Sequence, residues 1–470
     1  MSNKRFAALS FTVALALAGV VALLWLPALS KVEGLGGSRV ALAQAGTGII
    51  RVATTGSDTP GCGGVNPCQT VQYAVDQAQA GEEVRVASGL YTGVQGRPAP
   101  SEYLNPPASG VITQVVYISK TVTIRGGYTT AFTDPPDPEA NQTTLDAQGE
   151  GRVLFITGDI SPTIEGLHIT NGDAAGLGGR SSTDVGGGVY VINATVIISN
   201  NRMFSNTAQY GGGLYLHDSD ATLSGNTVTD NTASERGGGL YLWSSDATLS
   251  GNAVMSNTTG YSGGGLFLQF SDNAALSGNA VISNTAQVGG GLYLWGSDAT
   301  LTNNVVADNQ ATSSGSGLGI RDSSPSLLHT TIARNSGGSG VFVTSLSGDY
   351  GTVALTNTIL VSHSHSVGID VMAGNTATLE STLWYGNVTD WVGAGTIVTG
   401  THNYWGDPLF ATDGYHLMDG SAAIDKGVDA GVTTDIDGDS RPQGSAPDLG
   451  ADERAGIGTD VYLPIILKNR

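Results

Sequence analysis

Aromatic side chains that could stack on a ligand recur at a fixed interval in the middle of this 470-residue chain. They follow triple glycines that begin 25 or 26 residues apart, from Gly186 to Gly289. In an alternating strand these positions point outward, where aromatic rings can stack on sugar rings or anchor a protein partner. The alternative is that the stacked rings only stabilise a sheet. The residues of the predicted binding strip are Tyr190, Tyr215, Tyr241, Trp243, Phe267, Tyr293 and Trp295.

Carboxylates recur with nearly the same spacing, at Asp220, Asp246, Asp272 and Asp298. Paired carboxylates can act as general acid and base. A catalytic site, however, interrupts a repeat at one place, whereas these aspartates return in every copy and fit turns that cap strand ends. Basic residues are few, with no lysine between Lys120 and Lys426. We therefore predict no catalytic residue.

Three other groups of residues have metal-ligand or redox chemistry. Asp435, Asp437 and Asp439 have the alternating spacing of a calcium loop but lack its terminal glutamate, so they predict at most a structural calcium ion. Cys62 and Cys68 are the only cysteines, and in an exported protein such a close pair predicts a local disulfide. His363 and His365 would share a strand face as a possible metal pair, but an exposed polar strand is the favoured interpretation.

The elements that position these side chains follow from a period of about 26 residues. Each copy contains the triple glycine, short alternating apolar stretches and two asparagines five residues apart, as at Asn226 and Asn231. No copy has helical spacing. The period predicts an all-β, right-handed, single-stranded parallel β-helix with three short strands per coil. In this fold Leu214, Leu240 and Leu266 form one interior row, and the asparagines pair with their counterparts in the next coil.

The flanking segments differ from the repeat. Lys4 and Arg5 precede an apolar run, which indicates a signal peptide or an uncleaved N-terminal anchor. Helical spacing from Val71 to about Ala80 predicts a helix that caps the open end of the core. The predicted parts are the signal segment (1–45), the capped β-helix (46–401), a closing region (402–454) and a C-terminal tail (455–470).

The net charge of −20 excludes nucleic acid and anionic membrane surfaces as natural partners. Membrane contact is expected only if the N-terminal segment stays uncleaved. The protein is expected to be a monomer outside the cytoplasm, either secreted or on the cell surface.

Three segments resemble known groups of exported β-helix proteins. The opening, Cys68–Gln72 through Gly89–Tyr91, resembles the pectin-lyase-like superfamily. The repeats, such as Met203–Asn206 before a triple glycine, resemble those of polymorphic outer membrane proteins. The segments Asn403–Phe410 and Asp435–Pro442 resemble the choice-of-anchor Q domain, which in that group closes a secreted β-helix ahead of a surface-sorting tail.

Two functions follow from these patterns. The first is a non-catalytic adhesin or glycan-binding module that binds a polysaccharide or a cell-surface partner through the aromatic strip. The second is a polysaccharide lyase or glycoside hydrolase of the pectin-lyase-like superfamily that acts on an acidic polysaccharide.

Overall fold

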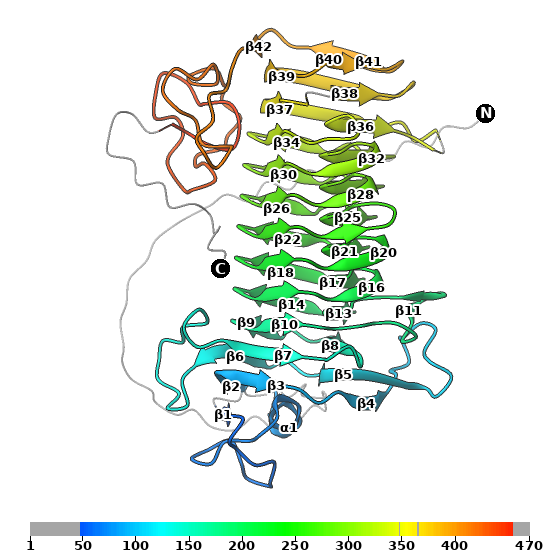
Figure 1. Cartoon of the computed structure of the whole chain (residues 1–470), viewed down its shortest axis with the longest axis vertical. Coiled ribbons are helices and arrows are strands. Elements are labelled where there is room, and N and C mark those ends of the chain that lie inside the picture. The colour runs from blue at the N-terminus through cyan, green and yellow to red at the C-terminus, as the bar shows by residue number, and fades with distance from the viewer. Residues whose placement is uncertain (1–47, 347, 364–365, 455–470) are drawn as a thin grey trace, which may run out of the picture. The chain divides into compact units, whose positions relative to one another are not determined.

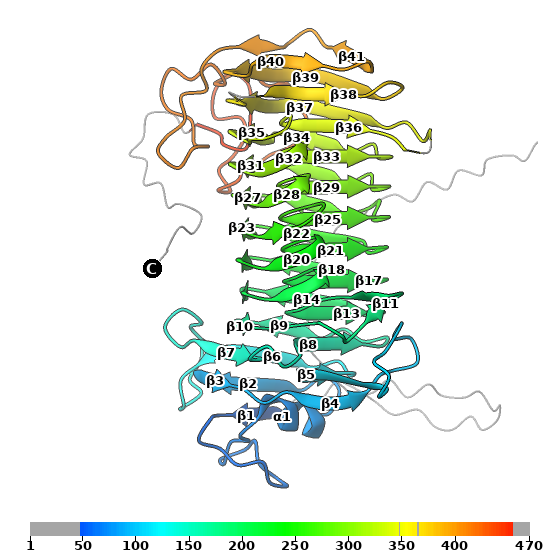
Figure 2. The ribbon, with the colours of Figure 1, turned by 45° about the vertical axis from the view of Figure 1, so that its right-hand side comes forward.

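The computed structural model describes residues 48–346, 348–363 and 366–454. The predicted signal segment and C-terminal tail lie outside the described residues. The described chain is a parallel β-helix whose strands stack coil upon coil, as Figures 1 and 2 show. The fold class and the period of about 26 residues are therefore confirmed.

One coil illustrates the local structure. In the described residues, the stacked sheets are called A (23 strands), B (12 strands) and D (5 strands), and the two-stranded sheet C is a hairpin. Strand β17 (Leu214–His217) belongs to sheet B, and β18 (Asp220–Ser224) and β19 (Thr227–Thr229) belong to sheet A. Strand β20 (Thr232–Arg236) belongs to sheet D. Each strand pairs in parallel with the strand one period later. The short sheet D strand is an addition to the three strands predicted for each coil.

The strands divide among three stacked sheets and one hairpin. Sheet A contains β1 (Ile49–Val52), β2 (Glu83–Ala87), β3 (Gly89–Tyr91), β6 (Thr123–Tyr128), β7 (Thr143–Asp146), β9 (Thr163–Glu165), β10 (His168–Thr170), β14 (Thr195–Ser199), β15 (Arg202–Phe204), β18, β19, β22 (Ala247–Ser250), β23 (Ala253–Met255), β26 (Ala275–Ser277), β27 (Ala280–Ile282), β30 (Thr300–Thr302), β31 (Val305–Ala307), β34 (Ser326–Leu328), β35 (Thr331–Ala333), β37 (Thr352–Val361), β39 (Thr376–Tyr385), β41 (Thr396–Thr399) and β42 (Tyr404–Trp405). Sheet B contains β4 (Gln95–Pro98), β5 (Val111–Ile118), β8 (Arg152–Thr157), β13 (Val189–Ile192), β17, β21 (Leu240–Trp243), β25 (Leu266–Gln269), β29 (Leu292–Trp295), β33 (Leu318–Arg321), β36 (Val341–Thr344), β38 (Val367–Val371) and β40 (Thr389–Val392). Sheet D contains β16 (Thr207–Tyr210), β20, β24 (Thr258–Thr259), β28 (Thr285–Val288) and β32 (Gln310–Ser314), and the hairpin is β11 (Gly179–Arg180) with β12 (Thr183–Asp184).

Leucines fill the interior in the predicted row. Leu214 is paired with Leu240, and Leu240 with Leu266, in the register of sheet B. All three side chains are buried in the main hydrophobic core. Burying an apolar side chain of this size contributes about 1.5–3 kcal/mol, so each added coil extends the stabilising core.

Asparagines form two buried amide ladders at the bends, as predicted. In one ladder the side-chain Nδ2 of Asn231 donates to Oδ1 of Asn257 at 3.0 Å, and Nδ2 of Asn257 donates to Oδ1 of Asn284 at 3.0 Å. The same Oδ1 atoms also accept the backbone N–H of the preceding ladder residue. Each amide therefore fixes both the spacing and the register of its neighbours.

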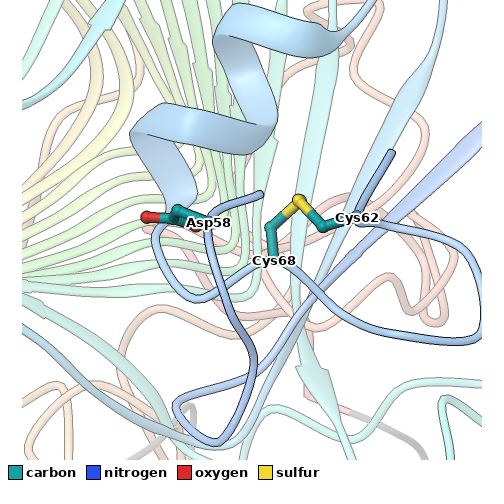
Figure 3. A group of neighbouring side chains, drawn as sticks. All are labelled: Asp58, Cys62 and Cys68. Carbon is teal, nitrogen blue, oxygen red and sulfur yellow. A yellow bond between two sulfur atoms is a disulfide. The ribbon is translucent and has the colours of Figure 1, made fainter. Parts of the chain in front are cut away.

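The N-terminal end of the core is covered by α1 (Val71–Gln77), a shorter helix than predicted. Thr70 caps it by accepting the N–H of Tyr73, and Val71, Ala74 and Val75 are buried below it. Cys62 and Cys68 form the predicted disulfide (Figure 3).

The C-terminal region packs against the side of the last coils. Leu417, Leu449 and Ala451 form a second apolar cluster with the outer face of β31, β35, β37 and β39. In Figure 1 this region appears as the orange and red loops beside those strands. The predicted closing region therefore covers an outer sheet face.

Within the described part of the chain, no helix has the length and apolar character needed to cross a membrane.

The ladder geometry predicts the effect of removing one amide. Asn257→Ala leaves the backbone N–H and the Nδ2 group of Asn231 without their shared acceptor, and it removes the bond from Asn257 to the carbonyl of Val228. We expect a loss of about 2–4 kcal/mol in the free energy of unfolding, measured by denaturant titration. The control is Asn273→Ala, an exposed asparagine that bonds Asp246, for which we expect a loss below about 1 kcal/mol. Equal losses in the two variants would contradict the structural role of the ladder.

His363 occupies an asparagine position in the same ladder. Its Nε2 faces Nδ2 of Asn335 at 3.5 Å, and its Nδ1 lies 2.8 Å from Oδ1 of Asn387. Burial lowers the pKa of His363 to about 4. Both ring nitrogens therefore serve the ladder in the neutral form, and His365, its predicted partner in a metal pair, lies outside the described residues.

This histidine predicts an acid-sensitive stability. Because the unfolded pKa is about 6.5, the unfolded state takes up the proton first, and stability is lost as pH falls from about 6.5 to about 4. This one group is expected to cost about 3 kcal/mol between pH 7 and pH 4. His363→Asn should remove this loss while keeping the ladder, so thermal unfolding curves of the variant and the natural protein should diverge on acidification. The exposed His402→Asn serves as control, and parallel pH profiles for His363→Asn and the natural protein would refute the assignment.

Candidate functional site

Five rings of the predicted aromatic strip form one continuous column on sheet B, whose strands are stacked in Figure 2. The register pairs Tyr190 with Tyr215, Tyr215 with Tyr241, Tyr241 with Phe267 and Phe267 with Tyr293. Successive ring centroids lie 5.6, 5.0, 4.8 and 5.2 Å apart. The five rings therefore follow one another along the sheet, but only Phe267 and Tyr293 are stacked, and the other neighbouring pairs are tilted or edge-on.

The exposure that the prediction assumed is not found for these rings. Tyr190, Tyr215 and Tyr241 are fully buried, and Phe267 and Tyr293 are 1% and 7% exposed. They belong to a separate aromatic cluster, outside both the main core and the C-terminal apolar cluster. This aromatic cluster includes Tyr103 from the proline-rich excursion after β4. An outward side chain is buried here because the excursion, the β11–β12 hairpin and several arginines lie over the sheet. A ligand cannot stack on the faces of these rings.

Arginines provide much of this cover. The guanidinium of Arg180 lies 4.3 Å from the ring centroid of Trp243, and its Nη1 donates to the hydroxyl of Tyr241 at 3.1 Å. Arg236 lies over Phe267 and Trp295, and Arg321 lies 4.4 Å from the ring centroid of Trp295. Three of the five arginines between residues 160 and 400 lie on this face.

The reachable aromatic groups lie at the edges of the column. Trp243 and Trp295 are half-buried, whereas Tyr261 and Phe270 are 51% and 53% exposed. Phe270 follows β25, and its ring centroid lies 6.1 Å from that of Trp295. Sequence reasoning missed Tyr261 and Phe270 because neither recurs with the period. We define the aromatic–arginine patch as Arg180, Arg236, Trp243, Tyr261, Phe270, Trp295 and Arg321.

His217 interrupts the repeat beside this patch. It occupies the position held by Trp243 in the next coil, and the two ring centroids lie 4.2 Å apart. Burial, assisted by the positive charge of Arg180, lowers the pKa of His217 to about 4. The imidazole is therefore neutral at neutral pH, with Nδ1 3.4 Å from the hydroxyl of Tyr190.

Three of the four recurring aspartates lie in turns, but they bond the next coil and do not cap their own strands, whereas Asp220 lies within β18. Asp246 accepts the backbone N–H and side-chain amide of Asn273, Asp272 accepts the N–H of Asp298, and Asp298 accepts the N–H of Ser324. These bonds link each exposed turn to the next coil. No acid pair needs to be invoked to explain the column.

The predicted calcium loop is held by backbone bonds. Oδ1 of Asp435 accepts the N–H groups of Asp437 and Asp439, and its Oδ2 accepts the N–H of Glu453. Asp437 Oδ2 lies 2.6 Å from Nε2 of His416. Within the described residues, Asp437 therefore belongs to a different group of converging donors, formed with His416 and Asp452.

The second group of converging donors is Asp58 with Cys62 and Cys68 (Figure 3). Both sulfur atoms are used by the disulfide, and Asp58 accepts the N–H groups of Gln69 and Thr70. This group therefore joins the N-terminal loop to the start of α1.

The pKa of His416 is shifted in the opposite direction to those of His217 and His363. Its Nδ1 contacts Asp413 and its Nε2 contacts Asp437. Burial lowers the pKa of His416, but these carboxylates outweigh burial and raise it to about 10. Burial raises the pKa of Asp452 to about 7.

Several solved structures match this chain at low sequence identity. The pectate lyase Pel9A is 14% identical, with 87% of this chain and 98% of that chain covered and a TM-score of 0.35. The complex of XylC with xylose is 10% identical, with 86% and 98% covered and a TM-score of 0.42. The A-module of the mannuronan C-5 epimerase from Azotobacter vinelandii is 12% identical, with 72% and 94% covered and a TM-score of 0.32. These likenesses concern the fold alone.

No curated protein matches the sequence of this chain. A family model described as periplasmic copper-binding protein (NosD) matches residues 142–409. The matched segment contains the central coils, both asparagine ladders and the aromatic–arginine patch, and it is more than half of the chain. The chain therefore belongs to the NosD family.

Proposed function

We propose that this chain is an exported, non-catalytic β-helix protein that binds a polysaccharide through the aromatic–arginine patch. The supporting observation is the distribution of its cations. In a chain with a net charge of −20, Arg180, Arg236 and Arg321 all lie over aromatic rings on sheet B. Such a concentration of guanidinium and indole groups suits a ligand with apolar ring faces and polar or acidic substituents.

The central element of the patch is Trp295. Arg236 and Arg321 lie 5.4 and 4.4 Å from its ring centroid, and exposed Phe270 lies beside it. The arginines hold the indole in place and retain donors for hydroxyl or carboxylate oxygens. Tyr261 and Phe270 extend the contact surface at the edges. The earlier prediction of Tyr190, Tyr215, Tyr241, Phe267 and Tyr293 as ligand contacts is replaced by a supporting role for these rings, while Trp243 and Trp295 remain proposed contacts.

The side chains of the matched segment that could bind a metal do not support copper binding. Copper sites combine imidazole nitrogen with thiolate, thioether or further nitrogen donors. Among the described residues of 142–409, no three His, Cys, Asp or Glu donors converge within ligand distance. His217 and His363 are buried in contacts with other side chains. The described residues of this segment therefore do not fit a copper centre.

The family name places its members in the periplasm, and an exported location suits this chain. We extend this proposal to a periplasmic or cell-surface monomer, with residues 402–454 acting as an anchor-associated region of the choice-of-anchor type. A polysaccharide or cell-surface partner is the expected ligand, and nucleic acid is not.

A lyase or hydrolase is the second candidate, favoured by His217. A neutral imidazole next to the hydroxyl of Tyr190, on the same face as three arginines, has the groups that proton abstraction beside a carboxylate would require. Its burial, with the imidazole only 4% exposed, argues for the binding role instead.

The binding proposal predicts that Trp295→Ala combined with Phe270→Ala weakens glycan binding. Loss of two stacking surfaces, each contributing about 1 kcal/mol, should lower the affinity at least about tenfold. The measurement is titration calorimetry with defined oligosaccharides, half of them uronates and half neutral. Tyr385→Ala, which removes an exposed aromatic ring from the end of β39, is the matched control and should leave binding unchanged.

Unchanged affinity in the double variant would exclude the patch as the binding surface. The enzymatic alternative is tested by incubating the natural protein with the uronate polymers. New unsaturated ends would indicate a lyase, and new reducing ends alone would indicate a hydrolase.

A further inference from the structure

Three side chains from separate segments converge in the C-terminal region. They are His416, Asp437 and Asp452, and their ligand atoms all lie within 4.8 Å of one another. Nε2 of His416 lies 2.6 Å from Oδ2 of Asp437 and 3.9 Å from Oδ1 of Asp452. Two carboxylate oxygens therefore lie near the same imidazole nitrogen.

A fourth residue holds the imidazole from behind. Asp413 Oδ2 contacts Nδ1 of His416, and its Oδ1 accepts the backbone N–H groups of Tyr415 and His416. A metal-binding histidine commonly donates its second N–H to a carboxylate in this way, which fixes the ring orientation and increases ligand basicity. The arrangement of Asp413, His416 and the two facing carboxylates has this form.

The facing carboxylates are also held in place. Oδ2 of Asp452 accepts the N–H of Leu417 at 2.7 Å, whereas Oδ1 lies too far from Nε2 for a hydrogen bond. The backbone of Asp437 is fixed by its N–H bond to Oδ1 of Asp435. The side chains of His416 and Asp452 are 3% and 6% exposed, whereas that of Asp437 is 26% exposed, so the group opens to solvent on the side of Asp437.

An independent observation is the excess of buried negative charge around this group. Asp435, Asp448, Asp452 and Glu453 are all buried, and Arg441 is the buried guanidinium that faces them. Arg441 is bound to Glu453 at 2.9 Å, and backbone N–H groups bind Asp435 three times and Asp448 twice. Asp452 accepts the N–H of Leu417 through one of its two oxygens. Buried carboxylates require a compensating cation or several hydrogen bonds. A dication at His416 would supply that charge beside Asp452 and close to Asp435.

We propose that His416 Nε2, Asp437 Oδ2 and Asp452 Oδ1 bind one divalent transition-metal ion such as Zn²⁺, with Asp413 as the positioning residue. Binding replaces the proton on Nε2, which is released to solvent. The Nε2 to Oδ2 distance of 2.6 Å must then widen to about 3.3 Å, because both atoms would lie about 2.0–2.1 Å from the ion.

The donor set selects this class of ion. One imidazole nitrogen with two carboxylates suits zinc and related ions, whereas calcium requires six to eight oxygen ligands. The backbone bonds already made by Asp435 leave few oxygens for calcium. The site lies beyond residue 409, so it is separate from both the family match and the proposed glycan surface.

The ion would join three segments of the C-terminal region. Leu417 and Ala451, next to ligands His416 and Asp452, pack against the outer face of sheet A. Metal binding should therefore strengthen the attachment of this region to the last coils, in addition to local folding.

The test uses the full exported chain after treatment with a chelator, and titrates it with Zn²⁺ by calorimetry. We expect one ion per chain, release of about one proton in buffers of different ionisation enthalpy, and a higher melting temperature. Asp437→Asn keeps an acceptor for Nε2 and preserves the fold while removing one charged ligand, and it should weaken binding at least tenfold. Asp413→Asn should weaken binding about 10- to 100-fold without changing the stoichiometry.

His416→Gln should abolish the single-site binding, and His402→Gln, which alters an exposed histidine paired with Glu380, should leave it unchanged. The proposal would be overturned if the natural protein showed no saturable Zn²⁺ binding. It would also be overturned if Asp437→Asn and His416→Gln both bound Zn²⁺ with the affinity of the natural protein. Ca²⁺ binding that is tighter than Zn²⁺ binding and unaffected by His416→Gln would also overturn it, and would favour the predicted calcium loop of Asp435, Asp437 and Asp439.

Discussion

The buried amide ladder is the constraint on which the rest of this structure depends. An asparagine buried at a bend has two donors and an acceptor to satisfy, and leaving one unpaired costs about 1–3 kcal/mol. Asn231, Asn257 and Asn284 satisfy one another and the backbone around them, at distances between 2.9 and 3.0 Å. A coil that slipped by one residue would lose these bonds and would also turn its leucines outward.

Fixed register also explains why the outer face of sheet B carries stacked rings. Once Leu240 lies below Leu266 in the core, Tyr241 must lie below Phe267 on the other face. A column of apolar rings outside the core would be exposed unless other groups covered it, and an exposed patch of that size favours association. The excursion around Tyr103 and the guanidinium groups of Arg180 and Arg236 cover the column and form the patch.

The repeated part of the structure could be predicted from the sequence. In a stacked solenoid, a residue type that recurs with the period must occupy the same position in every coil. Leu214, Asn231 and Asp246 have the predicted positions for this reason. The cover over Tyr215 and Tyr241 could not be predicted, since the excursion after β4 and the β11–β12 hairpin each occur once and have no period. The convergence of His416 with Asp452 depends on the path of an irregular segment, for which no spacing rule exists. The spacing of Asp435, Asp437 and Asp439 indicated metal chemistry, but only the three-dimensional path shows that Asp437 turns toward a histidine.

A regular solenoid also limits where specific chemistry can arise. Identical coils present the same side chain to the same neighbours, so the environment of one residue is shared by all its counterparts. Differentiated environments need positions that depart from the period. His363 takes an asparagine position in the ladder, and His217 lies at a strand position where the residue changes from coil to coil. In both cases burial shifts the histidine pKa downward, which makes these residues parts of the packing. His416 is different, because it lies outside the repeat, where carboxylates can approach both ring nitrogens and reverse the shift. The irregular C-terminal region can therefore provide an ionic site that the coils themselves cannot.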